Sequence, residues 1–148
     1  MDKADKLKVL FICSQNAGRS QMAEAFLRSF AGDSFEVDSA GLEPAAAVHP
    51  LVQQVMAEEG IDLSGKKPKS VFDLFRQGRL FDYVIAVCDQ QTAESCPVFP
   101  GLTRRWNWPF PDPAAVTGSR EEQLVQVRAI RDMIRHKVER PFAESPED

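Results

Sequence analysis

Residues 9–20, V-L-F-I-C-S-Q-N-A-G-R-S, constrain the fold more than any other segment of the chain. Residues 7–12 are mostly apolar and predict a buried strand, which is followed by a cysteine and then by a short polar loop. Met22, Phe26 and Phe30 then recur every four residues, which predicts an amphipathic helix. A strand, a tight loop and a helix in this order are typical of a parallel sheet that is covered by helices.

The rest of the chain repeats this alternation. We expect further strands at residues 35–38, 82–87 and 102–108, a turn at Gly41, and helical segments at 50–59 and 71–75. Pro109, Pro111 and Pro113 predict an irregular loop around Asp112.

The clearest helix is the last one. Ser119 and Glu122 fit a capping box, and five apolar residues follow at steps of three and four, namely Leu124, Val127, Ile130, Ile134 and Val138. The predicted fold is therefore α/β, a single-domain four-stranded parallel sheet with helices on both faces. The domain spans residues 1–148, with flexible tails at about 1–6 and 142–148.

The bulk composition excludes several classes of partner. The net charge of −4 disfavours nucleic acid and anionic membrane surfaces, which attract basic proteins. No apolar run approaches the roughly 18 residues of a membrane span, and the first residues do not resemble a signal peptide. Three cysteines, an odd number, favour a cytoplasmic protein with reduced thiols.

The polar loop after the first strand predicts an oxyanion site. Free amides at a helix start attract anions, and the guanidinium of Arg19 matches two oxygens of phosphate or arsenate. These positive surroundings favour the thiolate form of Cys13, a nucleophile, to which the Ser20 hydroxyl can donate. Asn16 is expected to hold the loop in shape, while Ala17 and Gly18 let its backbone curl. The expected oxyanion-binding residues are Ser14, Gln15, Asn16, Ala17, Gly18, Arg19 and Ser20.

A plainer interpretation stays open for the same residues. Cys13 would then be a buried cysteine that closes a strand, with Arg19 on a solvated helix face. The position between a clear strand and a clear helix favours the catalytic interpretation.

The segment C-S-Q-N-A-G-R-S-Q-M-A-E-A resembles the phosphate loop of the low-molecular-weight tyrosine phosphatase fold. Within that fold it is more similar to thioredoxin-coupled arsenate reductases, because Gln21 stands where phosphatases usually have a proline. S-A-G at residues 39–41 matches both branches, and the resemblance covers about residues 9–138.

Asp112, within P-F-P-D-P-A, is the candidate general acid that protonates the leaving oxygen. An aspartate before proline is also a common turn, but the resemblance to the D-P loop of the family favours the catalytic role. Ala114 follows where phosphatases usually have a tyrosine, which again resembles the reductases.

Cys88 ends a predicted strand, as Cys13 does, so both thiols are expected at the carboxyl edge of the sheet. The resemblance implies a relay in which Cys13 attacks arsenate and Cys88 attacks Cys13 to release arsenite. Cys96 then attacks Cys88, and thioredoxin reduces the final disulfide. Seven residues separate Cys88 from Cys96, one more than is typical of these reductases.

No cofactor and no metal are predicted. Some members of the family bind potassium, and Asn16, Glu24 and Ser39 match the positions that hold it, but Val71 stands where a further carboxylate is expected. His49 and His136 show no ligand spacing and are interpreted as surface residues. Trp106 and Trp108 are interpreted as core and rim, with a role in docking thioredoxin left open.

Three functions compete at this point. The first is a thioredoxin-dependent arsenate reductase with weak phosphatase activity, and the second is a phosphatase that acts through a Cys13 phosphoenzyme. The third is a protein that binds oxyanions or senses redox state without catalysis.

Overall fold

The computed structural model of this chain describes residues 6–140. Flexible tails were expected at about 1–6 and 142–148, and all of these residues except Lys6 lie outside the described part. The ammonium of Lys6 donates to the carbonyl of Gly32 at 2.9 Å. The elements are β1 (Leu7–Cys13), α1 (Arg19–Ala31), β2 (Phe35–Gly41), α2 (Pro50–Ala57), α3 (Val71–Arg76), β3 (Tyr83–Ala86), α4 (Gln90–Ala93), β4 (Arg104–Asn107) and α5 (Arg120–Glu139).

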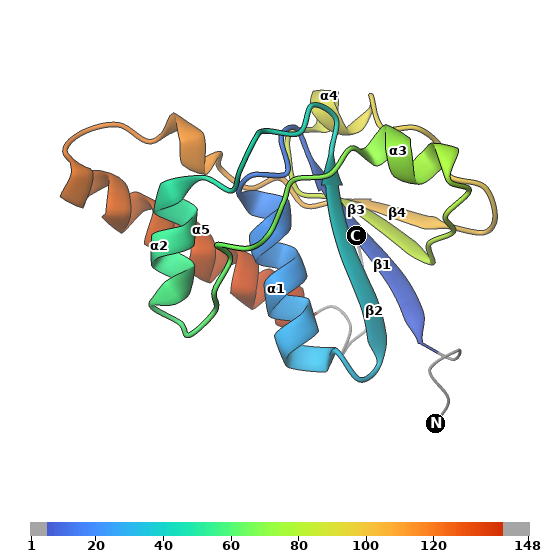
Figure 1. The fold of residues 1–148 in the computed structure, drawn as a ribbon, viewed down its shortest axis with the longest axis horizontal. Helices are drawn as coiled ribbons and strands as arrows, with labels where there is room; N and C mark the ends of the chain where they lie inside the picture. Colours follow the sequence, from blue (N-terminus) through green and yellow to red (C-terminus); the bar gives the residue numbers. More distant parts are fainter. Residues whose placement is uncertain (1–5, 141–148) are drawn as a thin grey trace.

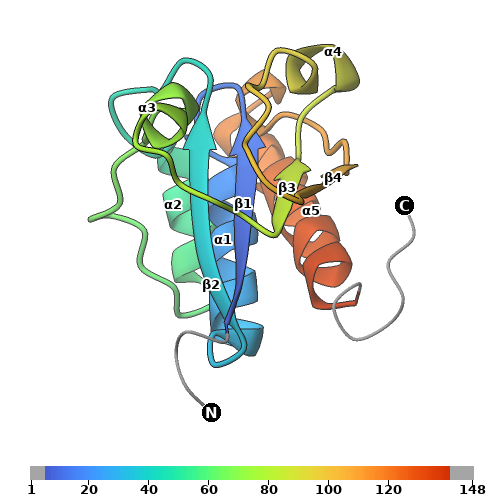
Figure 2. The same ribbon diagram turned by 90° about the vertical axis from the view of Figure 1, so that its right-hand side faces the viewer.

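The four strands form one parallel sheet in the order β2-β1-β3-β4. Figures 1 and 2 show α1, α2 and α5 on one side of the sheet, with α3 and α4 near the carboxyl ends of the strands. The predicted α/β fold with a four-stranded parallel sheet is confirmed. Because all four strands run the same way, the loops that follow β1 and β3 meet at one edge.

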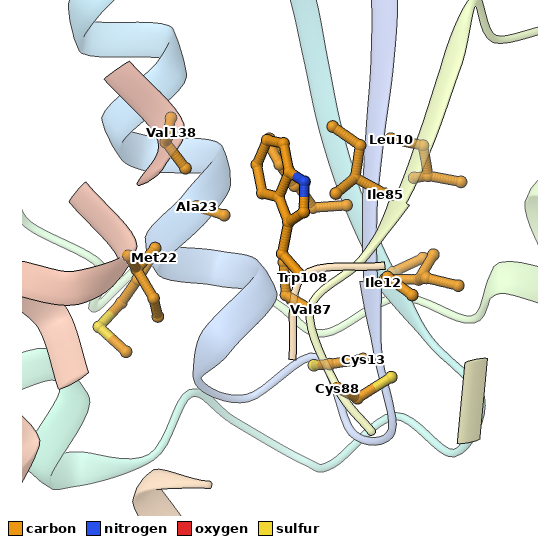
Figure 3. Packing of buried hydrophobic residues seen from close by; sticks show 14 of the residues in the cluster. Leu10, Ile12, Cys13, Met22, Ala23, Ile85, Val87, Cys88, Trp108 and Val138 are labelled. Carbon is orange, nitrogen blue, oxygen red and sulfur yellow. The ribbon is translucent and has the colours of Figure 1, made fainter. Parts of the chain in front are cut away.

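The core lies between the sheet and the helices α1 and α5. The ring of Phe11 on β1 lies 6.2 Å from the ring of Trp108, which stacks on Trp106 at 5.7 Å. Figure 3 shows Trp108 between the strands and the helix that carries Ala23. The interpretation of the two tryptophans as core and rim therefore holds.

The last helix has the predicted cap. The Ser119 hydroxyl accepts from the backbone N–H of Glu122, and the Glu122 carboxylate accepts from the backbone N–H of Ser119. All five predicted apolar residues of this helix are buried. None of the described helices combines the length and the apolar character that crossing a bilayer requires.

Two local predictions need correction. β2 does not end at residue 38 before a turn, because Gly41 still pairs with Cys13 and its N–H donates to the Lys69 carbonyl. Pro113–Ala115 forms a 3-10 helix where an irregular loop was expected. The segment between Cys88 and Cys96, for which the sequence predicted no element, contains the short helix α4. Both short helices lie beside residues that the sequence identified as functional.

Candidate active site

Cys13 is the last residue of β1, and its sulfur faces the loop that follows. The backbone N–H of Asn16 donates to Sγ at 3.2 Å, and the Ser20 hydroxyl lies 2.9 Å from it. Cys13 is only 3 % exposed. These two contacts hold the buried sulfur in a fixed position at the oxyanion pocket.

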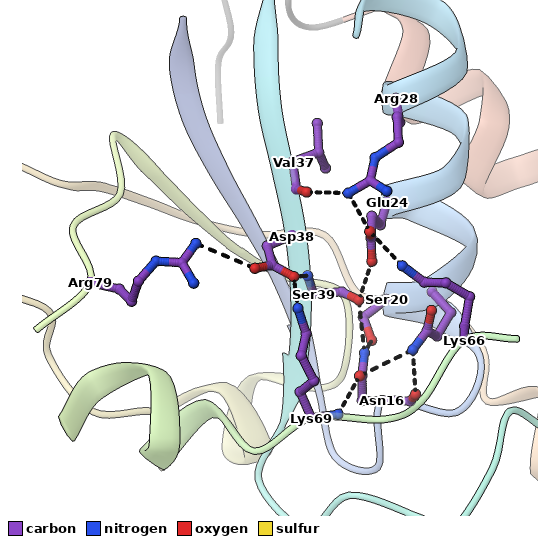
Figure 4. A network of polar contacts seen from close by, with 11 residues as sticks. Asn16, Ser20, Glu24, Arg28, Val37, Asp38, Ser39, Lys66, Lys69 and Arg79 are labelled. Carbon is purple, nitrogen blue, oxygen red and sulfur yellow. Dashed lines mark hydrogen bonds and ion pairs between the residues drawn. The ribbon is translucent and has the colours of Figure 1, made fainter. Parts of the chain in front are cut away.

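The hydrogen bonds around Asn16, shown in Figure 4, determine which group donates to the Cys13 sulfur. The Asn16 amide group donates both to the Ser20 hydroxyl at 2.7 Å and to the Ser39 hydroxyl at 3.0 Å. The Ser39 hydroxyl donates a hydrogen bond to the carboxylate of Glu24 at 2.6 Å. Since Ser20 already accepts from Asn16, its proton is available to Cys13. The predicted donation from Ser20 thus agrees with the geometry.

Asn16 adopts the left-handed backbone conformation that turns the loop. From the sequence, we expected Ala17 and Gly18 to turn the loop. Asn16 is the one non-glycine residue with a positive φ, 54°, among residues 6–140. The side-chain oxygen Oδ1 of Asn16 accepts from the Gln21 amide at 3.1 Å and from the Lys69 backbone N–H at 2.9 Å. All the hydrogen-bonding capacity of this buried amide is therefore used, which offsets the strain of the left-handed backbone.

Gly18 also permits a close approach between two loops. A Cβ at this position would lie 3.3 Å from Cγ of Pro113. The missing side chain therefore lets the loop around Asp112 pack directly against the oxyanion loop.

Arg19 points into the site and not toward solvent. Its guanidinium donates to the Phe110 carbonyl at 3.1 Å and lies 3.8 Å from the Asp112 carboxylate. Its side chain is 9 % exposed, whereas that of Asp112 is 48 % exposed. The buried Arg19 guanidinium and the accessible Asp112 carboxylate thus lie near one another beside Cys13.

A small pocket occupies that space. Its walls combine the oxyanion loop, the start of α2 and the D-P turn, and the lining residues are Cys13, Ser14, Gln15, Ala17, Gly18, Arg19, His49, Asp112, Pro113 and Ala114. The other Asp112 oxygen accepts from the Ala114 N–H at 2.9 Å. Asp112 is therefore a turn residue and a pocket residue at the same time, so the two interpretations of this aspartate do not exclude each other.

Cys88 follows β3 and lies beside Cys13 (Figure 3). Burial raises the pKa of the Cys88 thiol to about 11, and the nearby Cys13 sulfur raises it further while Arg19 opposes both. A thiol with this pKa is protonated at neutral pH and is a weak nucleophile until its surroundings change.

Cys96 lies in a different place, in the wall of a cleft between the sheet and residues 93–98. Ile12, Val84 and Ala86 line the sheet side of this cleft. Burial raises the pKa of the Cys96 thiol to about 11, and Arg105 partly opposes this rise. All three cysteines are free thiols.

Comparison with known proteins explains this architecture. Residues 8–146 match the family described as low molecular weight phosphotyrosine protein phosphatase. The chain belongs to this phosphatase family. The resemblance in the oxyanion loop is thereby confirmed across nearly the whole chain.

Among its relatives are arsenate reductases. That of Shouchella clausii is 36 % identical over 140 residues, which cover 94 % of this chain and 96 % of the relative. A solved arsenate reductase in the phosphate binding state is 29 % identical with a TM-score of 0.71, covering 93 % of this chain and 97 % of that one. A thioredoxin-dependent arsenate reductase from Corynebacterium glutamicum is 30 % identical, with a TM-score of 0.64. The match covers 97 % of this chain and 66 % of that one.

The residues that match the potassium site of some family members are already neutralised by the chain itself. The buried Glu24 carboxylate lies 2.9 Å from the Lys66 ammonium and 2.7 Å from the Arg28 guanidinium. Two cations beside one carboxylate leave no net negative charge for a metal ion to neutralise, so these residues do not fit a potassium site. No group of three metal-binding side chains occurs within the described range either.

His49, interpreted from the sequence as a surface residue, is half-buried and lines the pocket. It also caps α2, because its Nδ1 accepts from the Leu51 N–H at 3.1 Å. Its own backbone N–H donates to the Ala17 carbonyl at 2.9 Å and so joins α2 to the oxyanion loop. The proline at position 50 marked the helix start, but only the tertiary contact shows that this start faces Cys13.

Proposed function

We propose that this phosphatase-family chain is an arsenate reductase, which converts arsenate to arsenite and is regenerated by thioredoxin. One observation carries the proposal: a second reduced thiol, Cys88, lies beside Cys13 at the oxyanion pocket. Hydrolysis of a phosphoester needs only the first thiol, whereas a two-electron reduction needs a second. The related arsenate reductases support this assignment.

In the first step the Cys13 thiolate attacks arsenic, and one oxygen leaves as water after Asp112 supplies a proton. Arg19 and the loop amides hold the remaining oxygens. In the second step the Cys88 thiolate attacks the Cys13 sulfur. The sulfur–arsenic bond breaks, and its electron pair stays on arsenic, which leaves as arsenite. Two thiols are oxidised to the Cys13–Cys88 disulfide, and arsenic(V) is reduced to arsenic(III).

Cys96 completes the cycle in this proposal. Its thiolate attacks Cys88, which frees Cys13 and transfers the disulfide to Cys88–Cys96. The dithiol of thioredoxin reduces that disulfide and is itself oxidised. Since Cys96 lies in a separate cleft, the segment of residues 89–95 has to move before the two sulfurs meet. No metal or cofactor enters these balanced steps, and we propose the cytoplasm, where thiols stay reduced, as the location.

A count of free thiols tests the function directly. Reduced protein is mixed with one equivalent of arsenate without thioredoxin, and thiols are titrated under denaturing conditions. We expect three thiols before the reaction and one afterwards. Peptide mapping is expected to find the Cys88–Cys96 disulfide, and the Cys13–Cys88 disulfide in Cys96→Ser.

The alternative is a phosphatase that forms a Cys13 phosphoenzyme, since the pocket and Asp112 would serve that reaction as well. Unchanged thiols together with fast aryl phosphate hydrolysis would establish it. Asp112→Asn is expected to slow either reaction far more than it weakens oxyanion binding, because it removes the proton donor and keeps the shape. Oxyanion binding without turnover would indicate the non-catalytic alternative.

A further inference from the structure

Four large apolar side chains that are exposed to solvent gather on one part of the surface. Leu102 is 100 % exposed, Val98 73 %, Leu80 54 % and Phe75 40 %. We call these four residues the Leu102 patch. Their exposure has no packing reason, because burial of such side chains would stabilise the fold.

Contacts beneath the patch show that its two halves are adjacent. The buried ring of Phe99 lies 5.7 Å from that of Phe75 and 5.3 Å from that of Phe81, which follows Leu80. A Cβ on Gly101 would lie 4.0 Å from Cδ2 of Leu80. The loop after Cys96 is thus anchored to the α3–β3 connection through Phe99, and its apolar neighbours point outward.

The patch is continuous with the third thiol of the proposed relay. Val98 lines the same cleft as Cys96, and Leu102 lies in the same loop between α4 and β4. A protein that covers this loop is therefore brought to the sulfur that the proposed cycle exposes last. Trp106, an earlier candidate for docking thioredoxin, lines the same cleft and stacks on Trp108, which packs against the core.

The charge around the patch indicates what covers it. The chain carries a net charge of −4, but residues 95–111 contain no aspartate or glutamate. Arg104 and Arg105, both exposed, lie in this stretch on β4, at the edge of the sheet. The segment that carries Val98 and Leu102 is thus apolar and basic on an acidic protein, although Glu94 lines the neighbouring cleft. This segment favours a partner with an apolar face and an acidic rim.

From this juxtaposition we propose that the Leu102 patch, with Arg104 beside it, is the surface on which the dithiol reductant protein docks. The proposal rests on the proposed function, since it names the surface that receives thioredoxin. The patch supplies apolar contact area. The arginines orient the approaching reductant protein and raise its association rate. Small thiols need no such surface, because they reach a disulfide by diffusion alone.

The test compares two reductants on the same enzyme variants. The double variant Val98→Ser, Leu102→Ser removes apolar surface from side chains that are exposed already, and Arg104→Glu reverses the charge. Phe30→Ser is the matched control, because Phe30 is 49 % exposed at the end of α1, away from α3 and α4 (Figure 1). Arsenate reduction is measured with thioredoxin plus its reductase and, separately, with dithiothreitol.

We expect the double variant to raise the KM for thioredoxin about tenfold and to leave turnover with dithiothreitol unchanged. Arg104→Glu is expected to raise the same KM and to weaken its dependence on salt, while Phe30→Ser changes neither. An unchanged KM for thioredoxin in the double variant overturns the docking surface. An equal loss with both reductants also overturns it, because the loop would then act on the thiol exchange itself. If the wild-type enzyme reduces arsenate with neither reductant, the proposed function fails and the docking surface with it.

Discussion

Gly41→Ala is the substitution that the structure predicts to damage the site most while adding only one carbon atom. Gly41 ends β2 opposite Cys13. A Cβ there would lie 2.7 Å from the backbone nitrogen of Asn16 and 2.9 Å from both the Gln15 carbonyl carbon and the Ser14 oxygen. All three neighbours are backbone atoms of the oxyanion loop, so no flexible side chain can rotate away.

The size of the effect follows from these distances. Ordinary contact begins at 3.4 Å, so the loop has to shift by about 0.7 Å at Asn16. Overpacking of this kind costs about 1–3 kcal/mol, and a cost of 2 kcal/mol lowers Tm by about 4–8 °C in a chain of this size. A displacement near 1 Å lowers a reaction rate by up to about 10²-fold, so a loss of about 10- to 100-fold is expected.

Gly65→Ala is the control, because a Cβ at that glycine would meet nothing within 4 Å and its φ is not positive. Both variants are compared with the wild type by thermal denaturation and by the rate of thiol loss after addition of arsenate. Gly65→Ala is expected to match the wild type in both measurements. If Gly41→Ala kept the wild-type Tm and rate, the tight contact between β2 and the oxyanion loop would be wrong.

Three further outcomes are expected. Iodoacetamide at pH 8 is expected to label Cys88 and Cys96 about 100-fold more slowly than an exposed thiol, because burial raises both pKa values from 9.0 to about 11. Phosphate is expected to block the labelling of Cys13. Peptide mapping over time measures both effects. The raised pKa values of Cys88 and Cys96 stabilise the folded state below pH 9, and this stability is lost as the pH rises to 11, by at most about 3 kcal/mol per thiol. Urea unfolding curves at pH 8 and pH 11 are therefore expected to differ. Equal curves would refute the burial of these thiols. Lys66→Met removes one of the two cations beside the buried Glu24 carboxylate and leaves Arg28 as its only cation partner among the described residues. Thiol loss is expected to slow several-fold in this variant, whereas the exposed Lys67→Met is expected to have no effect.

Much of the fold could be predicted because its signals are local. Periodicity placed α1 and α5, the capping residues Ser119 and Glu122 marked the start of α5, and apolar runs placed β1 and β3. A parallel sheet then follows from the alternation of strands and helices, and its carboxyl edge brings the residues after β1 and β3 together. The neighbourhood of Cys13 and Cys88 was predictable for this reason.

What could not be predicted depends on contacts between distant segments. The left-handed backbone of Asn16 is stabilised by Ser39 and Lys69, which lie 23 and 53 residues away in the sequence. His49 and Gly41 gained their roles because α2 and β2 pack against the oxyanion loop. No pattern of neighbouring residues contains this information, so the sequence interpreted His49 as surface and Gly41 as a turn.

The burial of Cys88 and Cys96 also determines how this chain withstands oxidative stress. Peroxides attack the thiolate, and a protonated thiol that solvent cannot reach reacts slowly. All three thiols are nearly buried, and Cys13 is the one that lines the oxyanion pocket. Should it be oxidised to a sulfenic acid, Cys88 beside it can condense with that group to a disulfide before irreversible products form. Cys88 would then protect Cys13 from irreversible oxidation. Thioredoxin, the proposed reductant, would return both cysteines to free thiols.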